Sequence, residues 1–269
     1  MPEAIAADPE KWYNYTQIFR TPLSITRTAK KTRLRTGDQY KKAKKEALEM
    51  HSVEIEKAYM FGYPSETTGS NGQPERTTMG LVPAIRGVAN TTYGGYPDIN
   101  LGGVVSDFPT TYSTSTWLDK GEEWLDTQLE QIFRYGGDER MAFCGNGVLL
   151  GINKLIKTYG NFDFTPKTMA YGIQVMEWVT PFGVVYFKTH PLFNLELSLR
   201  NSAVLFEPRN LIERYIDQTM FFADEEKQNT GRGRIDGTDE EYLTEAGLEF
   251  HEVIGGGYLT GFNTDGAGA

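Results

Sequence analysis

The apolar positions in the first third of the chain predict an extended segment followed by one long helix. Residues 13–28 are rich in β-branched and aromatic side chains in rough alternation, a pattern typical of two short strands interrupted at Pro22. Residues 39–61 contain no glycine or proline, and their apolar side chains recur at three- and four-residue steps. Asp38 stands directly before them as a suitable N-cap. We therefore predict a helix over this stretch, with His51 as a packing residue rather than a ligand.

Further along the chain, amphipathic and extended segments alternate. Helical spacing of apolar residues predicts helices over 118–135 and 147–159. Runs rich in Val, Phe and Tyr predict strands over 140–144, 168–179, 183–190, 202–206, 245–252 and 257–262, the last two paired with each other. Turn-forming residues predict a loop over 62–83, irregular structure over 91–116 and a flexible connection over 223–239. We also predict a short helix over 81–89 and a helical turn over 211–216. This order of elements predicts the α+β class.

Composition excludes several broad classes of protein. Of the 269 residues, 39% are hydrophobic and 23% charged, close to the averages for folded domains. No apolar run is long enough for a transmembrane helix, and the first residues lack the basic-then-apolar pattern of a secretory signal. The single cysteine, Cys144, cannot form an intrachain disulfide or a thiol-rich metal site. We therefore expect a protein without a membrane segment and without export by the secretory route.

Charge is distributed unevenly along the chain. The net charge is -9, yet residues 11–45 carry eleven Lys and Arg against one acid, a local charge of +10. Residues 213–252 carry twelve acids against four bases, a local charge of -8. One interpretation of the basic segment is a solvated face or a non-specific contact with polyanions. The other is that it meets an acidic surface on a second copy of the chain. A dedicated nucleic-acid module is less expected, because zinc-finger spacing and RNP-type aromatics are missing.

The sequence shows no catalytic or metal-binding pattern. The three histidines are far apart, and no G-x-S-x-G, H-E-x-x-H or Walker A motif is present. We therefore expect no enzymatic activity, no metal and no cofactor. One alternative is a carbohydrate-active enzyme, because aromatic rings beside carboxylates can line a sugar cleft. The residues that would form that cleft are Trp117, Trp124, Trp178, Glu122, Glu123 and Glu177.

Three stretches together resemble the major capsid proteins of tailed bacteriophages, in their short-chain branch. The first runs from Asn14 to Gly37 and leads into the long helix ending in EIEKAYMFG. The second is ERTTMGL at residues 75–81, and the third is EYLTEAGLEF at residues 241–250 with the glycine-rich segment 255–262. The resemblance implies the capsid fold that tailed phages share with encapsulins and the herpesvirus capsid floor.

The resemblance also implies a division of the chain into domains. Residues 1–36 would be the returning part of an extended loop that reaches a neighbouring subunit, so the chain would begin inside that loop. Residues 37–141 would be the peripheral domain, with its spine helix at 38–62 and its second helix near 117–136. Residues 142–222 would form the axial domain, and 223–269 would return to the peripheral domain as its closing strands.

The function implied is that of a structural subunit of the virion, assembled in the host bacterial cytoplasm. Copies would form pentamers and hexamers of an icosahedral shell around phage double-stranded DNA, which they would contact non-specifically. Other expected partners are a portal and scaffold or decoration proteins, with no membrane partner. The residues expected to contact a neighbouring copy are Arg20, Arg27, Lys30, Lys31, Arg33, Arg35, Lys41, Lys42, Lys44 and Lys45. Within structural proteins, the alternative is the shell of an encapsulin-like compartment.

Overall fold

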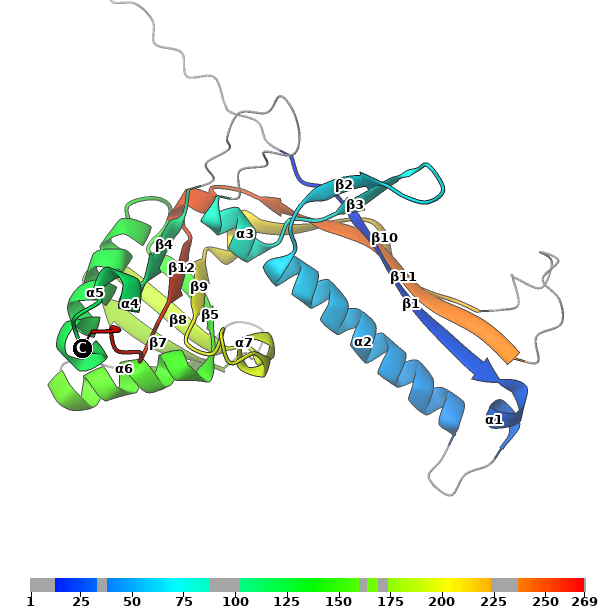
Figure 1. The fold of residues 1–269 in the computed structure, drawn as a ribbon, viewed down its shortest axis with the longest axis horizontal. Helices are drawn as coiled ribbons and strands as arrows, with labels where there is room; N and C mark the ends of the chain where they lie inside the picture. The colour runs from blue at the N-terminus through cyan, green and yellow to red at the C-terminus, as the bar shows by residue number, and fades with distance from the viewer. Residues whose placement is uncertain are drawn as a thin grey trace, which may run out of the picture.

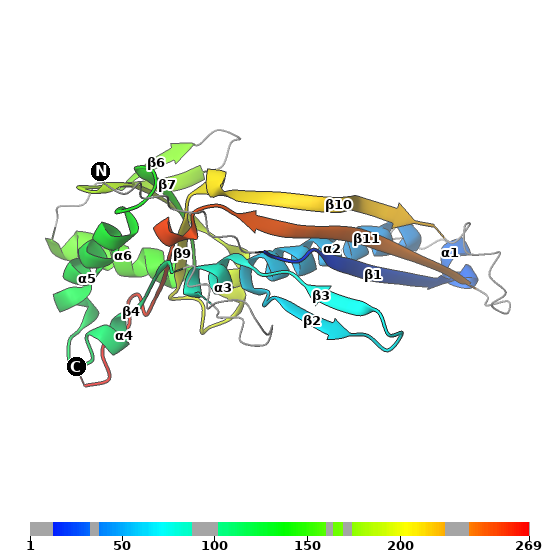
Figure 2. The same ribbon diagram turned by 90° about the horizontal axis from the view of Figure 1, so that it is seen from above.

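A long helix lying on a three-stranded antiparallel sheet forms an elongated limb (Figures 1 and 2). The computed structural model describes residues 13–32, 38–87, 102–159, 164–168, 174–223 and 237–268. The limb consists of β1 (Gln17–Thr26), α1 (Arg27–Lys31), α2 (Gln39–Phe61), β10 (Leu211–Phe222) and β11 (Gly237–Phe250), with strand order β1-β11-β10. A hairpin of β2 (Ser65–Thr68) and β3 (Pro74–Thr77) lies beside β1.

Local sequence sets the bounds of α2. The Asp38 side chain accepts hydrogen bonds from the amides of Tyr40 and Lys41, at 3.0 and 3.4 Å, and so caps two of the free N–H groups of the first turn. At the other end, the Gly62 amide donates to the Ala58 carbonyl at 2.9 Å. The predicted helix and its N-cap are therefore confirmed.

The remaining elements form a body around a seven-stranded mixed sheet, in the order β4-β12-β9-β5-β8-β7-β6. Its strands are β4 (Val104–Asp107), β5 (Glu139–Cys144), β6 (Phe164–Thr168), β7 (Gln174–Thr180), β8 (Gly183–Thr189), β9 (Ala203–Phe206) and β12 (Gly257–Thr260). Its helices are α4 (Phe108–Thr111), α5 (Trp117–Ile132), α6 (Asn146–Tyr159) and α7 (Pro191–Leu195). The buried face of α5 packs with α6 and the sheet in one apolar core.

A second apolar core joins the body to the limb. It includes Met60 at the end of α2, Ile85 of α3 (Leu81–Arg86), Phe193 of α7, Phe206 of β9 and Leu248 of β11. Because residues of both parts share this core, the limb is a packed extension of the body rather than a tethered arm.

Several predictions of local structure are confirmed, and others are wrong. The helices at α5 and α6 and the strands at β5, β8 and β9 are confirmed. Pro22 does not interrupt β1, since β1 is an edge strand, where a missing N–H is tolerated. The predicted loop 62–83 contains a hairpin and the start of α3, and the predicted helical turn at 211–216 is the start of strand β10. Most of 223–239 and part of 91–116 lie outside the described residues.

Long-range pairing corrects the predicted pairing of the last two strands. β11 pairs with β1 and β10, whereas β12 pairs with β4 and β9, so the two predicted closing strands lie in different sheets. Helix α5 packs in the body, and β10 lies in the limb. Residues 17–26 are a strand of the limb's own sheet rather than a projecting loop.

Candidate assembly surface

The free end of the limb is basic. Helix α1 and the first turns of α2 lie together at the end farthest from the body (Figure 1). The exposed lysines there are Lys30, Lys31, Lys41, Lys42 and Lys45. The side chains of Lys42 and Lys45 are 77% and 78% exposed, and their ammonium groups lie 3.7 and 3.6 Å from carboxylates one turn further along α2. Such exposed pairs contribute little stability, so these lysines remain accessible to another molecule.

Two of the predicted contact residues lie over aromatic rings of the same chain. Lys44 Nζ lies 3.4 Å from the centre of the Phe221 ring, and Lys30 Nζ lies 4.6 Å from that of Tyr40. Tyr40 in turn donates from its hydroxyl to Glu240 Oε2 at 2.7 Å. Burial, with the adjacent Glu240 carboxylate, raises the pKa of Tyr40 to about 12, so the hydroxyl stays protonated. Lys44 therefore helps to hold α2 on the limb sheet.

The other basic residues are placed differently. Phe19 and Thr21 of β1 are buried under α2, so Arg20 between them faces the opposite side of the sheet and is exposed. Arg27 begins α1. Arg33 and Arg35 lie outside the described residues. The structure thus gathers the lysines of α1 and α2 at one end and leaves Arg20 apart from them.

The sheet face turned away from α2 is acidic along its central strand. Alternate β11 residues from Glu240 to Phe250 are buried beneath α2, so the residues between them point outward. The outward acids are Asp239, Glu241, Glu245 and Glu249. Glu249 is balanced by Arg214 at 2.5 Å, and those contacts, with one from His251, lower its pKa. The outer face of the limb sheet is therefore acidic along β11 and partly neutralised within the chain.

Exposed apolar side chains form two further surfaces that the sequence did not reveal. Leu195 and Leu197, at and after the end of α7, are 75% and 83% exposed. On the edge strand β10, Tyr215, Ile216 and Met220 are also exposed. The Leu-x-Leu pattern at 195–197 could have signalled the first surface. The exposed surface on β10 was missed because the start of that strand, residues 211–216, was predicted to be a helical turn.

An apolar groove lies between the second half of α2 and the limb sheet. Its volume is about 480 Å³. The lining residues are Ser52, Ile55, Glu56, Tyr59, Met60, Leu81, Leu211 and Leu248. Tyr59 is held there by a 2.8 Å hydrogen bond from its hydroxyl to Glu213 Oε1.

The geometry does not support a carbohydrate cleft. Trp117, Trp124 and Trp178 are buried, so none offers a face to a sugar. The indole N–H groups of Trp117 and Trp124 donate inside the body, to the Gly151 carbonyl and Ser106 Oγ. The three tryptophans therefore cannot form the aromatic platform that a sugar cleft beside Glu122, Glu123 and Glu177 would need.

The described residues show no other chemical centre. They contain no group of three or more His, Cys, Asp or Glu side chains that could hold a metal ion. Cys144 is buried, and that burial raises the pKa of its thiol to about 12, which makes it inert. Nor does any helix among them have the length and apolar character needed to cross a membrane.

A long helix on a three-stranded limb sheet, joined to a body with its own sheet, is the capsid fold shared by tailed phages and encapsulins. The SrpI encapsulin complex of Synechococcus elongatus PCC 7942 superposes with a TM-score of 0.55 at 11% identity, covering 93% of this chain and 74% of that one. The capsid of cyanophage A-1(L) superposes with a TM-score of 0.54 at 11% identity, covering 92% of this chain and 78% of that one.

Sequence comparison identifies the family. The SU10 major capsid protein model matches residues 1–262, and the chain belongs to that family. The major capsid protein of Pseudomonas phage PaMx41 is 26% identical over 242 residues, which are 90% of this chain and 54% of that protein. The chain thus spans about half the length of this curated relative. The family is one of structural proteins of the phage capsid rather than of enzymes.

Proposed function

We propose that copies of this chain assemble as pentamers and hexamers into an icosahedral shell around double-stranded DNA. Membership of the major capsid protein family over residues 1–262 carries this proposal. Interfaces in which one patch meets a different patch of the next copy generate rings when the rotation between copies closes. The chain has unlike surfaces of this kind, because the limb ends in lysines while the outer face of its sheet is acidic.

The basic residues supply orientation, and apolar contacts supply most of the stability. An exposed ion pair contributes only about 0.2–1 kcal/mol. Apolar surface contributes roughly 25 cal/mol for each Å² removed from water. The exposed side chains of Leu195, Leu197 and Ile216 therefore add more to an interface than any single lysine. Shell closure follows from many such weak contacts repeated around each ring.

In this assembly the limb is the peripheral domain and the body is the axial domain, whose loops surround the ring axes. A portal would occupy one vertex, and scaffold or decoration proteins would bind the growing or completed shell. The acidic net charge of -9 favours weak, non-specific contact with the packaged DNA.

Charge reversal tests the role of the basic end. We expect Lys30→Glu with Lys31→Glu, and separately Arg33→Glu with Arg35→Glu, to block shell formation while leaving the subunit folded. The readouts are electron microscopy of the particles and circular dichroism of the subunit. Repulsion between the new glutamates and the acidic neighbouring surface is the physical reason.

A matched control separates a specific contact from a change in net charge. Lys154→Glu with Lys157→Glu makes the same charge change on exposed positions of α6, and we expect normal shells from it. Normal shells from both limb variants would contradict the proposed contact between the basic end of the limb and the acidic surface of a neighbouring copy. Loss of shells from the α6 variant as well would attribute the effect to net charge and contradict it equally.

A further inference from the structure

Two of the crossings that the chain makes between the limb and the body lie next to each other. One crossing, at residues 207–210, leads from β9 of the body to β10 of the limb. The other, at residues 251–256, leads from β11 of the limb back to β12 of the body. The amide of His251 donates to the carbonyl of Asn210 at 2.7 Å, so the crossings lie side by side. The angle between limb and body therefore depends on what holds these two short segments, as well as on the apolar core that the two parts share.

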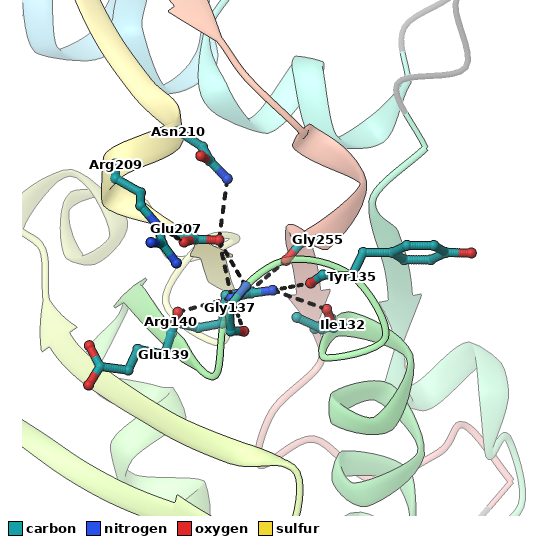
Figure 3. A network of polar contacts seen from close by, with 9 residues as sticks. All are labelled: Ile132, Tyr135, Gly137, Glu139, Arg140, Glu207, Arg209, Asn210 and Gly255. Atoms are coloured by element: carbon teal, nitrogen blue, oxygen red, sulfur yellow. Dashed lines mark hydrogen bonds and ion pairs between the residues drawn. The ribbon is translucent and has the colours of Figure 1, made fainter. Parts of the chain in front are cut away.

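Arg140, near the start of β5, contacts both crossings with one buried guanidinium (Figure 3). Its Nε donates to the carbonyl of Gly255 in the second crossing, at 2.9 Å. Its Nη1 lies 3.5 Å from Glu207 Oε2 in the first crossing. Nη1 also donates to the carbonyls of Gly137 at 2.7 Å and Glu139 at 3.0 Å, and Nη2 donates to those of Ile132 at 3.5 Å and Tyr135. A planar guanidinium can reach this many acceptors at once, and an ammonium cannot.

Glu207 secures the first crossing from the other side (Figure 3). Its carboxylate accepts from Arg209 Nε, from Asn210 Nδ2 at 3.3 Å and from the amide of Gly137 at 3.3 Å. Burial alone would raise the pKa of Glu207, but these donors and the charge of Arg140 outweigh burial and lower it. The carboxylate is therefore ionised at neutral pH.

The backbone around this pair is shaped to admit it. Gly136 has a φ of +81°, and a Cβ there would lie 2.9 Å from both Arg140 Nη2 and Glu207 Oε2. Glu252, at the start of the second crossing, is also left-handed, with a φ of 51°. A non-glycine residue in this conformation is held there by its surroundings.

We propose that Arg140 fixes the angle between limb and body by holding both crossings, and that this angle sets the curvature of the assembled shell. The second part rests on the proposed function. A separate tie supports the same orientation, because His190 Nε2 at the start of α7 lies 2.8 Å from Glu56 Oε1 of α2. Arg140 is thus a positioning residue for the whole limb.

The test measures the angle within a single chain. Spin labels are placed at Met50→Cys on the limb and Thr127→Cys on the body, both exposed positions, while buried Cys144 stays unlabelled. Labelled chains are diluted with excess unlabelled chain, and the distance distribution is measured by pulsed electron paramagnetic resonance. The variants are Glu207→Gln and Arg140→Lys. Their matched controls are Glu130→Gln and Arg134→Lys, in an exposed pair bonded at 2.8 Å near the end of α5.

We expect Glu207→Gln and Arg140→Lys to broaden the distance distribution and shift its mean, with the controls unchanged. If Arg140→Lys fails to fold, Glu207→Gln carries the test. A distribution for folded Glu207→Gln that coincides with wild type would overturn the proposal. Because the distances come from unassembled chain, this result is independent of whether shells form.

The consequence for assembly is measured separately. We expect Glu207→Gln to give shells with a wider range of diameters than wild type by electron microscopy. Shells of one unchanged diameter, from a variant whose distance distribution has broadened, would overturn the link to curvature. Absence of shells from the wild-type chain would instead contradict the proposed function.

Discussion

Single buried polar residues connect elements that are distant in the sequence. His51 on α2 is fully buried, with Nδ1 2.9 Å from Thr21 Oγ1 of β1 and Nε2 2.7 Å from Thr244 Oγ1 of β11. It is therefore a packing residue, as predicted, and it ties the spine helix to two strands of the limb. Arg140 has the same connecting role at the junction. Removing one partner of a buried ion pair, such as that of Arg140 with Glu207, typically costs about 3–5 kcal/mol, because the other charge is left buried and unpaired.

His51 predicts a pH dependence of stability. Burial lowers its pKa from 6.5, and the nearby Glu54 charge only partly opposes that effect. The unfolded chain therefore binds a proton at a higher pH than the folded one, so stability is lost as pH falls below 6.5. We expect His51→Gln to reduce the difference in urea unfolding free energy between about pH 7.5 and about pH 5.5. His251→Gln, at an exposed histidine, is the control, and equal pH dependence in wild type and His51→Gln would contradict this role.

At the scale of elements, terminal residues and neighbours decide where each helix and strand lies. Asp38 caps α2, whose basic first turns oppose the helix dipole. The first turn therefore depends on its side-chain cap and on contacts with the sheet, such as that of Lys44 with Phe221.

Loss of the Asp38 cap should weaken the limb. We expect Asp38→Ala to lower the unfolding free energy by about 0.5–2 kcal/mol, while Asp38→Asn, which can still cap, changes it much less. Urea unfolding and hydrogen exchange of the Tyr40 and Lys41 amides measure the two variants. Identical behaviour of the alanine and asparagine variants would show that the hydrogen bonds of this cap contribute nothing.

The sequence predicts the elements whose pattern is local. α2, α5 and α6 have a clear helical period, and β5 and β9 are short apolar runs. β10 was mistaken for a helical turn because most of its residues are exposed on both faces, which removes the alternation that identifies a half-buried strand. The pairing of β11 with β1 could not be found from the sequence, because β1 lies more than two hundred residues away along the chain.

The candidate surface was predictable in part for the same reason. Runs of charge are visible in the sequence, so exposed residues such as Lys42 and Lys45 were expected. Lys44 contacts the ring of Phe221, and Arg140 contacts Glu207 and the carbonyl of Gly255. These contacts arise only when distant segments pack together.

At the scale of the whole molecule, the shape and the charges suit a repeated tile. The limb extends away from the body and carries its lysines at the free end (Figures 1 and 2). The second apolar core and the contacts of Arg140 hold limb and body together. A tile of fixed shape can close into rings of five and six with small changes at its contacts, which is what an icosahedral shell requires.

The central claim is that this chain builds a shell from copies of itself. The most direct measurement is electron microscopy, with light scattering, of particles purified after expression of the chain alone and together with the proteins encoded beside it. We predict closed shells, or rings with five- and six-fold symmetry, in which this chain is the main component. A chain that remains monomeric under both conditions, or particles from which it is absent, would contradict the account.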